Sequence, residues 1–300
     1  MIATDQLDFI LEHAYIPEQM PSYVTAISTA EPFLFRNFLV YRKKEQIVFV
    51  GYPLTGDFQE ERMKKVLDEA IRQFNPGRVE LTAPSIPTSI HPQTPPSSDQ
   101  YYRVDLAALS ISQKVRNMIN RANRHLKVEK RKTLDEGHHQ LVREFLKAHA
   151  LGPEMRLIFE RIPDYVSSSA TAWVYDARDE EGEVVAFDVA EMGPKHYGFY
   201  MFNFTSDNRG VPGASDLLLW EILLQAKRED KHYINLGLGI NPGVVFFKEK
   251  WGGVPFLPYS SCSYEPPSVE RLETLLGDIE NIDRIMGLTL SNKYFIAKKL

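Results

Sequence analysis

The stretch 196–258 constrains the possible folds more than any other part of the chain. It opens with an aromatic, partly alternating run over 196–204, a composition typical of a β-strand. A polar loop follows, and residues 214–229 then place apolar side chains at helical spacing. A short apolar run over 232–238 predicts another strand. The order of strand, glycine-containing loop, helix and strand predicts a mixed α/β (α+β) fold in which helices flank central sheets.

The loop that enters this helix is suited to an anionic ligand. It contains Arg209, Gly210 and Gly213, and Ala214 opens the helix. The first N–H groups of a helix have no intrahelical partner, and the helix dipole adds partial positive charge there. Glycine lets a phosphate or carboxylate approach the backbone closely, and arginine adds a fork-shaped donor. We therefore predict that these four residues bind an anionic co-substrate.

This pattern resembles the catalytic half of the GNAT acyltransferase superfamily. Within it, the chain is most similar to the branch of the FemABX peptidoglycan aminoacyltransferases and the C-terminal domain of phosphatidylglycerol lysyltransferases. The resemblance is carried by 208–219, by the strand end 235–237 and by 247–253, where a phenylalanine-lysine pair precedes glycine as in FemABX proteins. It implies tandem GNAT-like lobes and transfer of an acyl or aminoacyl group to an amine or hydroxyl.

The GNAT pyrophosphate loop is altered in this chain. Arg209 and Ala214 fit the first and last places of that loop, but Pro212 stands where the middle glycine belongs. Proline has no N–H to donate. The resemblance implies either a CoA thioester or an aminoacyl-tRNA as donor and co-substrate, and the altered loop weighs against CoA. No other cofactor is implied.

A proline-rich segment divides the chain. Residues 84–98 hold five prolines among several serines and threonines, which is typical of a loop or linker. We place a boundary there, with 1–98 as the N-terminal lobe and 99–300 as the C-terminal lobe that contains the active site. The main elements expected are helices at 4–15, 58–74, 110–126, 138–149 and 268–286, a hairpin of 33–40 and 46–52, and strands at 79–83, 101–106, 170–176 and 183–192.

Charge is unevenly distributed along the chain. The formal net charge is -5, yet residues 114–132 hold eight bases and one acid. Exposed bases of this kind are often only a solvated helix face. These bases lack the opposite-sign partners of a merely soluble helix, so we predict that Arg116, Arg121 and Arg124 bind a polyanion such as the donor.

Composition and the N-terminal sequence also bear on where in the cell the protein is located. Hydrophobic residues make up 43% of the chain, but no run approaches the roughly 20 apolar residues that span a bilayer. No secretory signal pattern is visible, and the single cysteine, Cys262, suits a reducing environment. We expect a cytoplasmic protein without a transmembrane segment, in which Cys262 is a buried thiol. The histidines lack metal-ligand spacing, so no metal site is predicted.

Acyl transfer needs charge stabilisation at the carbonyl oxygen and proton transfer from the acceptor. By resemblance to the FemABX segment, Lys248 is the preferred charged stabiliser; its local sequence alone would suit a surface lysine. For the base, Asp188 lies in an apolar strand, where an acid is either functional or salt-bridged. Glu191 should face the opposite side of that strand, and Asp216 suits a helix N-terminus.

Aromatic and amide side chains supply the remaining candidates. GNAT enzymes often use a tyrosine acid near the last short helix, where this chain has Phe246 and Phe247. Tyr200 and Tyr259 remain, each expected to be a packing residue. Asn203 and Asn235 lie where they could orient an amide or carboxylate of the co-substrate.

Two functions therefore stay open. The first is a GNAT-fold transferase whose acceptor is a small molecule, a peptidoglycan precursor or a lipid headgroup. The second is a non-catalytic GNAT-like protein that binds an anionic ligand, supported by the altered loop and the missing tyrosine.

Overall fold

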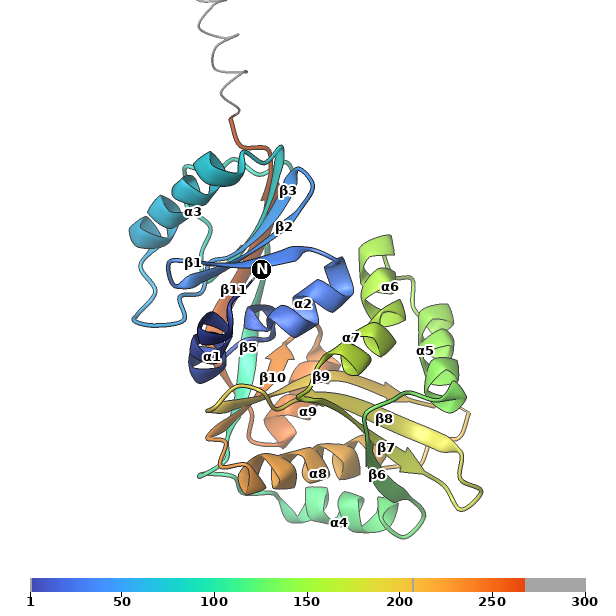
Figure 1. Cartoon of the computed structure of the whole chain (residues 1–300). Coiled ribbons are helices and arrows are strands. Elements are labelled where there is room, and N and C mark those ends of the chain that lie inside the picture. The colour runs from blue at the N-terminus through green and yellow to red at the C-terminus, as the bar shows by residue number, and fades with distance from the viewer. Residues whose placement is uncertain (1, 207, 268–300) are drawn as a thin grey trace, which may run out of the picture.

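The computed structural model describes residues 2–206 and 208–267, so the helix expected over 268–286 lies outside it. Eleven strands of the described chain form one sheet in the order β1-β2-β3-β4-β11-β5-β10-β9-β8-β7-β6 (Figure 1). The strands are β1 (Glu31–Phe35), β2 (Phe38–Lys43), β3 (Gln46–Val50), β4 (Arg78–Ala83), β5 (Ser97–Asp105), β6 (Lys127–Arg131), β7 (Ala172–Arg178), β8 (Val184–Glu191), β9 (Tyr197–Thr205), β10 (Tyr233–Leu238) and β11 (Val254–Tyr264). The helices are α1 (Thr4–His13), α2 (Pro21–Ser28), α3 (Glu60–Phe74), α4 (Gln113–Ala122), α5 (Glu136–Ala148), α6 (Pro153–Glu160), α7 (Ile162–Ser168), α8 (Ala214–Arg228) and α9 (Pro242–Lys250), with a 3-10 turn at Pro17–Gln19. The expected mixed α+β class is confirmed.

Strand β11 joins the two halves of the sheet, the first formed by β1 to β4 and the second by β5 to β10. Its residues 260–264 pair with β4, and residues 254–261 pair with β5, both antiparallel. The proline-rich segment connects β4 to β5, and residue 98, where we place the lobe boundary, is the second residue of β5. The hydrogen-bonded ladder therefore runs without a break from one half to the other.

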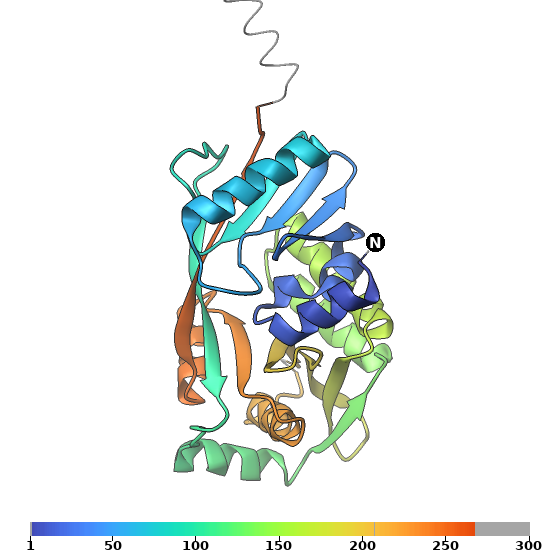
Figure 2. The same cartoon turned by 60° about the vertical axis from the view of Figure 1, so that its left-hand side comes forward.

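Helix α3 covers the strands of the first half (Figure 2). Its stripe of Met63, Leu67 and Ala70 is fully buried against residues of β2, β3 and β4. The charged residues of α3 occupy its other side, which is the pattern of an amphipathic helix on a sheet.

Two helical layers enclose the strands of the second half (Figure 1). Helices α8 and α4 cover one face, where Leu218 and Ile222 join a core with Trp251. Helices α5, α6 and α7 cover the other face, where Leu141 packs with Phe187. No helix in the described part of the chain is long and apolar enough to cross a bilayer.

The stretch 114–132, called the basic run below, folds differently from the single helix expected over 110–126. Ser112 caps α4 by accepting a hydrogen bond from the Val115 N–H at 3.3 Å, and the helix ends at Ala122. The second half of the run forms β6, the edge strand beside β7, which the sequence did not predict. Charged residues are common on edge strands because they discourage pairing with other chains.

Candidate active site

Strands β9 and β10 run parallel but pair over only three residues. The last pair is Asn235 with Phe199. Beyond it β9 continues to Thr205 and β10 to Leu238 without further pairing between them. Beyond this pair the two strands are therefore not bonded to each other, at the point where the sequence predicts the co-substrate.

Gly237 lies at these unpaired strand ends and places no side chain between them and Lys248. Gly237 has a φ of +77°, and β10 bulges between Asn235 and Gly237. A Cβ at this position would lie 3.7 Å from Lys248 Nζ and 4.0 Å from the Tyr200 carbonyl oxygen. The amine of α9 and the carbonyl of β9 thus face the same small space, with no side chain from residue 237 in it.

Lys248 is buried, with its amine close to Gly237. Its side chain is on α9 but only 4% of the residue is exposed. Its Nζ donates a hydrogen bond to the Leu238 carbonyl oxygen and lies 5.8 Å from the centre of the Tyr102 ring. Burial lowers the pKa of this ammonium to about 7, although Asp99 opposes the shift. Lys248 is therefore not the surface lysine that its local sequence alone would allow.

Asn235 has a structural role in this arrangement. It is fully buried; its Nδ2 donates to the Tyr15 carbonyl oxygen at 2.9 Å, and its Oδ1 accepts from the Gly237 N–H at 2.8 Å. The amide therefore fixes the bulge of β10 and ties it to the segment after α1. Both of its functional groups are already occupied in this structure.

Asp188 and Asn203 lie together on the face of the sheet that α8 covers. Asn203 Nδ2 donates to Asp188 Oδ1 at 2.5 Å and lies 3.3 Å from the Ser215 hydroxyl in the first turn of α8. Asp188 is fully buried, and burial raises its pKa to about 8. Burial, and after it the charge of the Asp188 carboxyl, raise the pKa of the Tyr200 hydroxyl. The carbonyl oxygen of the same residue is the one that lies close to Gly237.

The other two candidate acids are held in place by buried partners. Glu191 accepts from the Tyr165 hydroxyl at 2.8 Å and the Ser169 hydroxyl at 2.9 Å, on the opposite face from Asp188 as expected. Asp216 accepts from Trp251 Nε1 at 2.9 Å and pairs with Lys250 Nζ at 2.6 Å. Both contact sets suit a structural role.

The loop before α8 is arranged differently from a phosphate loop. Arg209 points to Glu183, with Nη1 and Oε2 3.2 Å apart, and is about half exposed. Gly213 has a φ of +93°, and a Cβ there would lie 2.6 Å from the Met118 carbonyl oxygen. Gly213 therefore allows α4 to pack closely against the start of α8, while Gly210 is exposed and Ala214 is buried.

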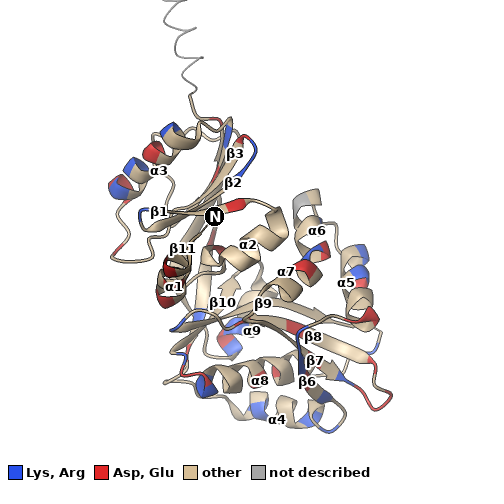
Figure 3. Ribbon diagram, viewed as in Figure 1, with Lys and Arg blue, Asp and Glu red and all other residues tan. Residues whose placement is uncertain are grey.

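The bases of the basic run separate into two groups. Lys127, Lys130, Arg131 and Lys132 all contact acids, aromatic rings or carbonyl groups. The four bases on or beside α4 are exposed and form no ion pair with the described residues, and α4 itself contains no acid (Figure 3). They are Lys114, Arg116, Arg121 and Arg124.

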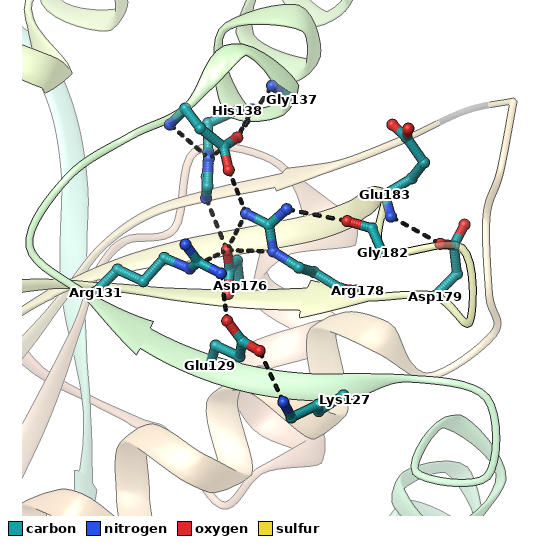
Figure 4. A network of polar contacts seen from close by, with 11 residues as sticks. Lys127, Glu129, Arg131, Gly137, His138, Asp176, Arg178, Asp179, Gly182 and Glu183 are labelled. Carbon is teal, nitrogen blue, oxygen red and sulfur yellow. Dashed lines mark hydrogen bonds and ion pairs between the residues drawn. The ribbon is translucent and has the colours of Figure 1, made fainter.

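A second polar cluster, not predicted from the sequence, joins β6, β7 and α5 (Figure 4). Asp176 is fully buried and lies 2.7 Å from Arg178 Nη2, 3.0 Å from Arg131 Nε and 3.3 Å from His138 Nε2. Asp135 caps α5 and bonds to both Arg178 and His138. Burial raises the pKa of Asp176, but the hydrogen bonds from His138 and Arg178 outweigh it and lower that pKa. The cluster fastens the edge strand to the sheet.

Two further expectations concern single side chains. Cys262 is buried, and burial raises its pKa to about 11, so the thiol is a poor nucleophile. Phe246 is 64% exposed on α9, whereas Tyr259 is half-buried. Neither of these aromatic residues contacts the Lys248 amine in the described structure.

The chain matches a known protein family over most of its length. A family model described as "Phosphatidylglycerol lysyltransferase, C-terminal" matches residues 32–266. A search of curated protein sequences gives no match.

Solved structures with the same fold include "The structure of L-PGS from Bacillus licheniformis" (18% identity, TM-score 0.56, covering 88% of this chain and 92% of that one). The C-terminal domain of a putative lysylphosphatidylglycerol synthetase from Agrobacterium fabrum is similar at 14% identity (TM-score 0.55, 85% and 91% covered). FemX is similar at 9% identity (TM-score 0.59, 87% and 96% covered). At these identities the likeness establishes the fold alone, and the same fold occurs in the lysylphosphatidylglycerol synthetase and FemX proteins whose branch the sequence resembles. With the family model covering most of its length, the chain belongs to the family of phosphatidylglycerol lysyltransferase C-terminal domains.

Proposed function

We propose that this protein is an aminoacyltransferase that moves an aminoacyl group from an aminoacyl-tRNA to a hydroxyl of a lipid headgroup such as that of phosphatidylglycerol. The observation that carries the proposal is the buried Lys248 amine beside the unpaired ends of β9 and β10, in a chain of this family. A buried cation beside strand ends that do not pair with each other is suited to stabilising charge that develops on a carbonyl oxygen.

The reaction is an exchange of esters. The acceptor hydroxyl oxygen attacks the aminoacyl carbonyl carbon, and negative charge develops on the carbonyl oxygen near the Lys248 ammonium. The bond from the carbonyl carbon to the terminal ribose oxygen then breaks. The proton lost by the acceptor hydroxyl ends on that ribose oxygen, so the exchange of one ester for another needs no further reactant.

Two features support an RNA donor over a CoA thioester. Pro212 lacks the N–H that a pyrophosphate loop would offer, and the Met118 carbonyl is directed at Gly213, where a phosphate would otherwise approach. On α4, Arg116, Arg121 and their neighbours have no acid partner among the described residues. Unpaired bases on an exposed helix suit the phosphates of an extended polyanion.

A second candidate function is a protein that binds the same anionic ligand without catalysis. It is favoured by the state of the candidate bases. Glu191 and Asp216 are held by buried partners, and burial raises the pKa of Asp188 to about 8, so that this acid is protonated at neutral pH. In this case Lys248 would hold a carbonyl or carboxylate group and no bond would break.

The test is transfer of a radiolabelled amino acid from tRNA to phosphatidylglycerol in vesicles. Lysyl-, alanyl- and arginyl-tRNA would be compared with labelled acyl-CoA, using the wild-type protein and Lys248→Ala. Transfer from at least one aminoacyl-tRNA that Lys248→Ala abolishes supports the proposal. Transfer from acyl-CoA alone would replace the donor class, and tight tRNA binding without any transfer by the wild-type protein would favour the binding protein.

A further inference from the structure

A groove on the outer side of the second half lies between α4, α8 and the segment that precedes α4. It encloses about 460 Å³. Its apolar wall consists of Leu109, Ile111, Ile119 and Trp220, and its polar lining of Ser110, Arg116, Asn120 and Lys227. Its lining includes neither Lys248 nor Gly237, and of its residues only Arg116 is assigned above to the donor.

Trp220 is a firm platform in this groove. Its ring stacks on the ring of Trp251 with centroids 6.4 Å apart, and Trp251 is fully buried and bonded to Asp216. A large aromatic side chain supported from behind in this way loses little freedom when a flat ring packs on it. The wall is therefore suited to a nucleobase, whose stacking on aromatic side chains is tolerant of sequence.

The charges at the groove suit a phosphate. Arg116 and Lys227 are exposed and form no ion pair with any described residue, although the protein has a net charge of -5. Arg121 and Arg124 continue the positive charge along the same helix and the turn after it. An aromatic wall next to unpaired bases is the combination by which proteins hold single-stranded nucleic acid.

The shape of this surface favours a nucleotide over a membrane. Docking on a bilayer needs protruding apolar side chains. The exposed large hydrophobic residues of the described chain all lie on other elements: Leu7, Met155, Leu157, Ile240, Phe246 and Val254. The face formed by α4 and α8 offers a concave apolar wall and charged rims instead.

We propose that the groove between α4 and α8 binds an unpaired nucleotide of the RNA donor, with the base on Trp220 and a phosphate between Arg116 and Lys227. This inference rests on the proposed function for the identity of the RNA. Trp220 lies six residues beyond the first residue of α8, about 9 Å along the helix axis. The first turn of α8 is where Ser215 meets Asn203, so the groove and the Asp188–Asn203 pair lie along the same helix.

The test measures binding of a fluorescein-labelled single-stranded RNA dodecamer and of unacylated tRNA to the full chain by anisotropy. Trp220→Ala should weaken binding about tenfold without changing its salt dependence, because stacking involves no counterion release. Arg116→Ala and Lys227→Ala should each make the slope of log K against log salt shallower by about 0.7. Lys65→Ala, an exposed lysine on α3, is the matched control and should change neither quantity.

Two measurements keep the result clear if Trp220→Ala perturbs folding. Trp220→Phe keeps an aromatic ring and should retain most of the affinity. Bound RNA should also quench the tryptophan fluorescence of the wild-type protein more than that of Trp220→Phe. RNA affinity that is the same in all groove variants would overturn the inference, as would groove variants that lose binding to acidic vesicles but not to RNA.

The assay also separates this inference from the proposed reaction, because unacylated tRNA cannot be turned over. A groove that binds RNA in a protein that transfers nothing would refute the enzyme and keep the groove. If Trp220→Ala and Arg116→Ala transfer from aminoacyl-tRNA with unchanged KM and kcat, the enzyme is supported and the groove is refuted as an RNA site.

Discussion

Lys248 on α9 donates a hydrogen bond from its Nζ to the carbonyl oxygen of Leu238, the last residue of β10. This bond places the amine at the end of the strand that no longer pairs with β9. The carbonyl acts as an anchor for a buried amine and leaves its remaining hydrogen positions for a ligand.

Removal of the Lys248 amine should abolish most transfer without unfolding the protein. We expect Lys248→Met to lower kcat by about 10²- to 10³-fold, the usual effect of losing one donor to a developing oxyanion. The melting temperature should stay the same or rise, because burying a cation is unfavourable. Initial rates and thermal melts measure the two effects, with Lys65→Met as a control for loss of one exposed positive charge. A rate within threefold of the wild type would remove Lys248 from the reaction.

The transfer rate should fall as pH rises through about 7. Burial lowers the pKa of Lys248 to about 7, so the ammonium that we assign to charge stabilisation is lost above this pH. A profile of kcat/KM from pH 6 to 9 should decline by about tenfold per pH unit on its alkaline side. Lys248→Arg, which stays protonated, should flatten this decline. A profile that rises through pH 7 would instead assign proton abstraction to the neutral amine.

Gly237→Ala should reduce the transfer rate by more than its loss of folding stability explains. Gly237 and Gly252 have nearly equal φ angles of +77° and +75°, so alanine should cost about 1–2 kcal/mol of backbone strain at either position. Only at Gly237 would the new methyl group enter the space facing Lys248 Nζ and the Tyr200 carbonyl, since nothing lies within 4 Å at Gly252. Comparing kcat/KM and unfolding free energy for the two variants separates strain from obstruction. Equal losses of activity would show that the space is not used.

Stability should depend on pH through Asp188. Its pKa is raised from 3.8 to about 8 in the folded protein, so folding keeps a proton that the unfolded chain loses above pH 4. The stabilisation is complete below pH 4 and is lost as pH rises toward 8, by about 1.4 kcal/mol per unit in that window. Asp188→Asn should therefore gain stability relative to the wild type between pH 5 and pH 8. Urea unfolding at these two pH values is the measurement, and Asp57→Asn controls for the change in charge. If the difference in unfolding free energy between Asp188→Asn and the wild type is the same at both pH values, Asp188 is already ionised in the folded protein.

Gly213→Ala should loosen α4. The added Cβ would lie 2.6 Å from the Met118 carbonyl oxygen, whereas at Gly182, which also has a positive φ, it would meet nothing within 4 Å. We expect Gly213→Ala to lower the melting temperature by several degrees more than Gly182→Ala, because backbone atoms of α4 must move. Amide exchange in α4 should rise in the first variant only. Equal melting temperatures for both variants would contradict the close contact.

The order of elements in the second half could be predicted from the sequence because its apolar spacing is regular. The predicted run 214–229 matches α8, Ala214–Arg228, to within one residue. Strand β6 could not be predicted, because Lys127 to Arg131 is mostly charged and its pairing depends on Asp176 of another strand. Local composition carries no information about such a distant partner.

The candidate site was partly accessible from the sequence. An acid in an apolar strand indicated that Asp188 has a special environment, and the resemblance to FemABX proteins indicated Lys248. The space left by Gly237 depends on where β9 and β10 stop pairing, which no local pattern specifies. Arg209 was grouped with Gly213 by the loop, yet its side chain reaches Glu183 on the turn between β7 and β8. Trp220 resembled any other core position of an amphipathic helix.

Strand β11 has a mechanical consequence for any substrate. It is hydrogen-bonded to β4 along one part and to β5 along another, so bending the halves against each other would break ladder bonds in both pairs. We therefore expect the two halves to keep their arrangement when a substrate enters, with side chains and surface loops adjusting over a frame whose dimensions are set when the chain folds.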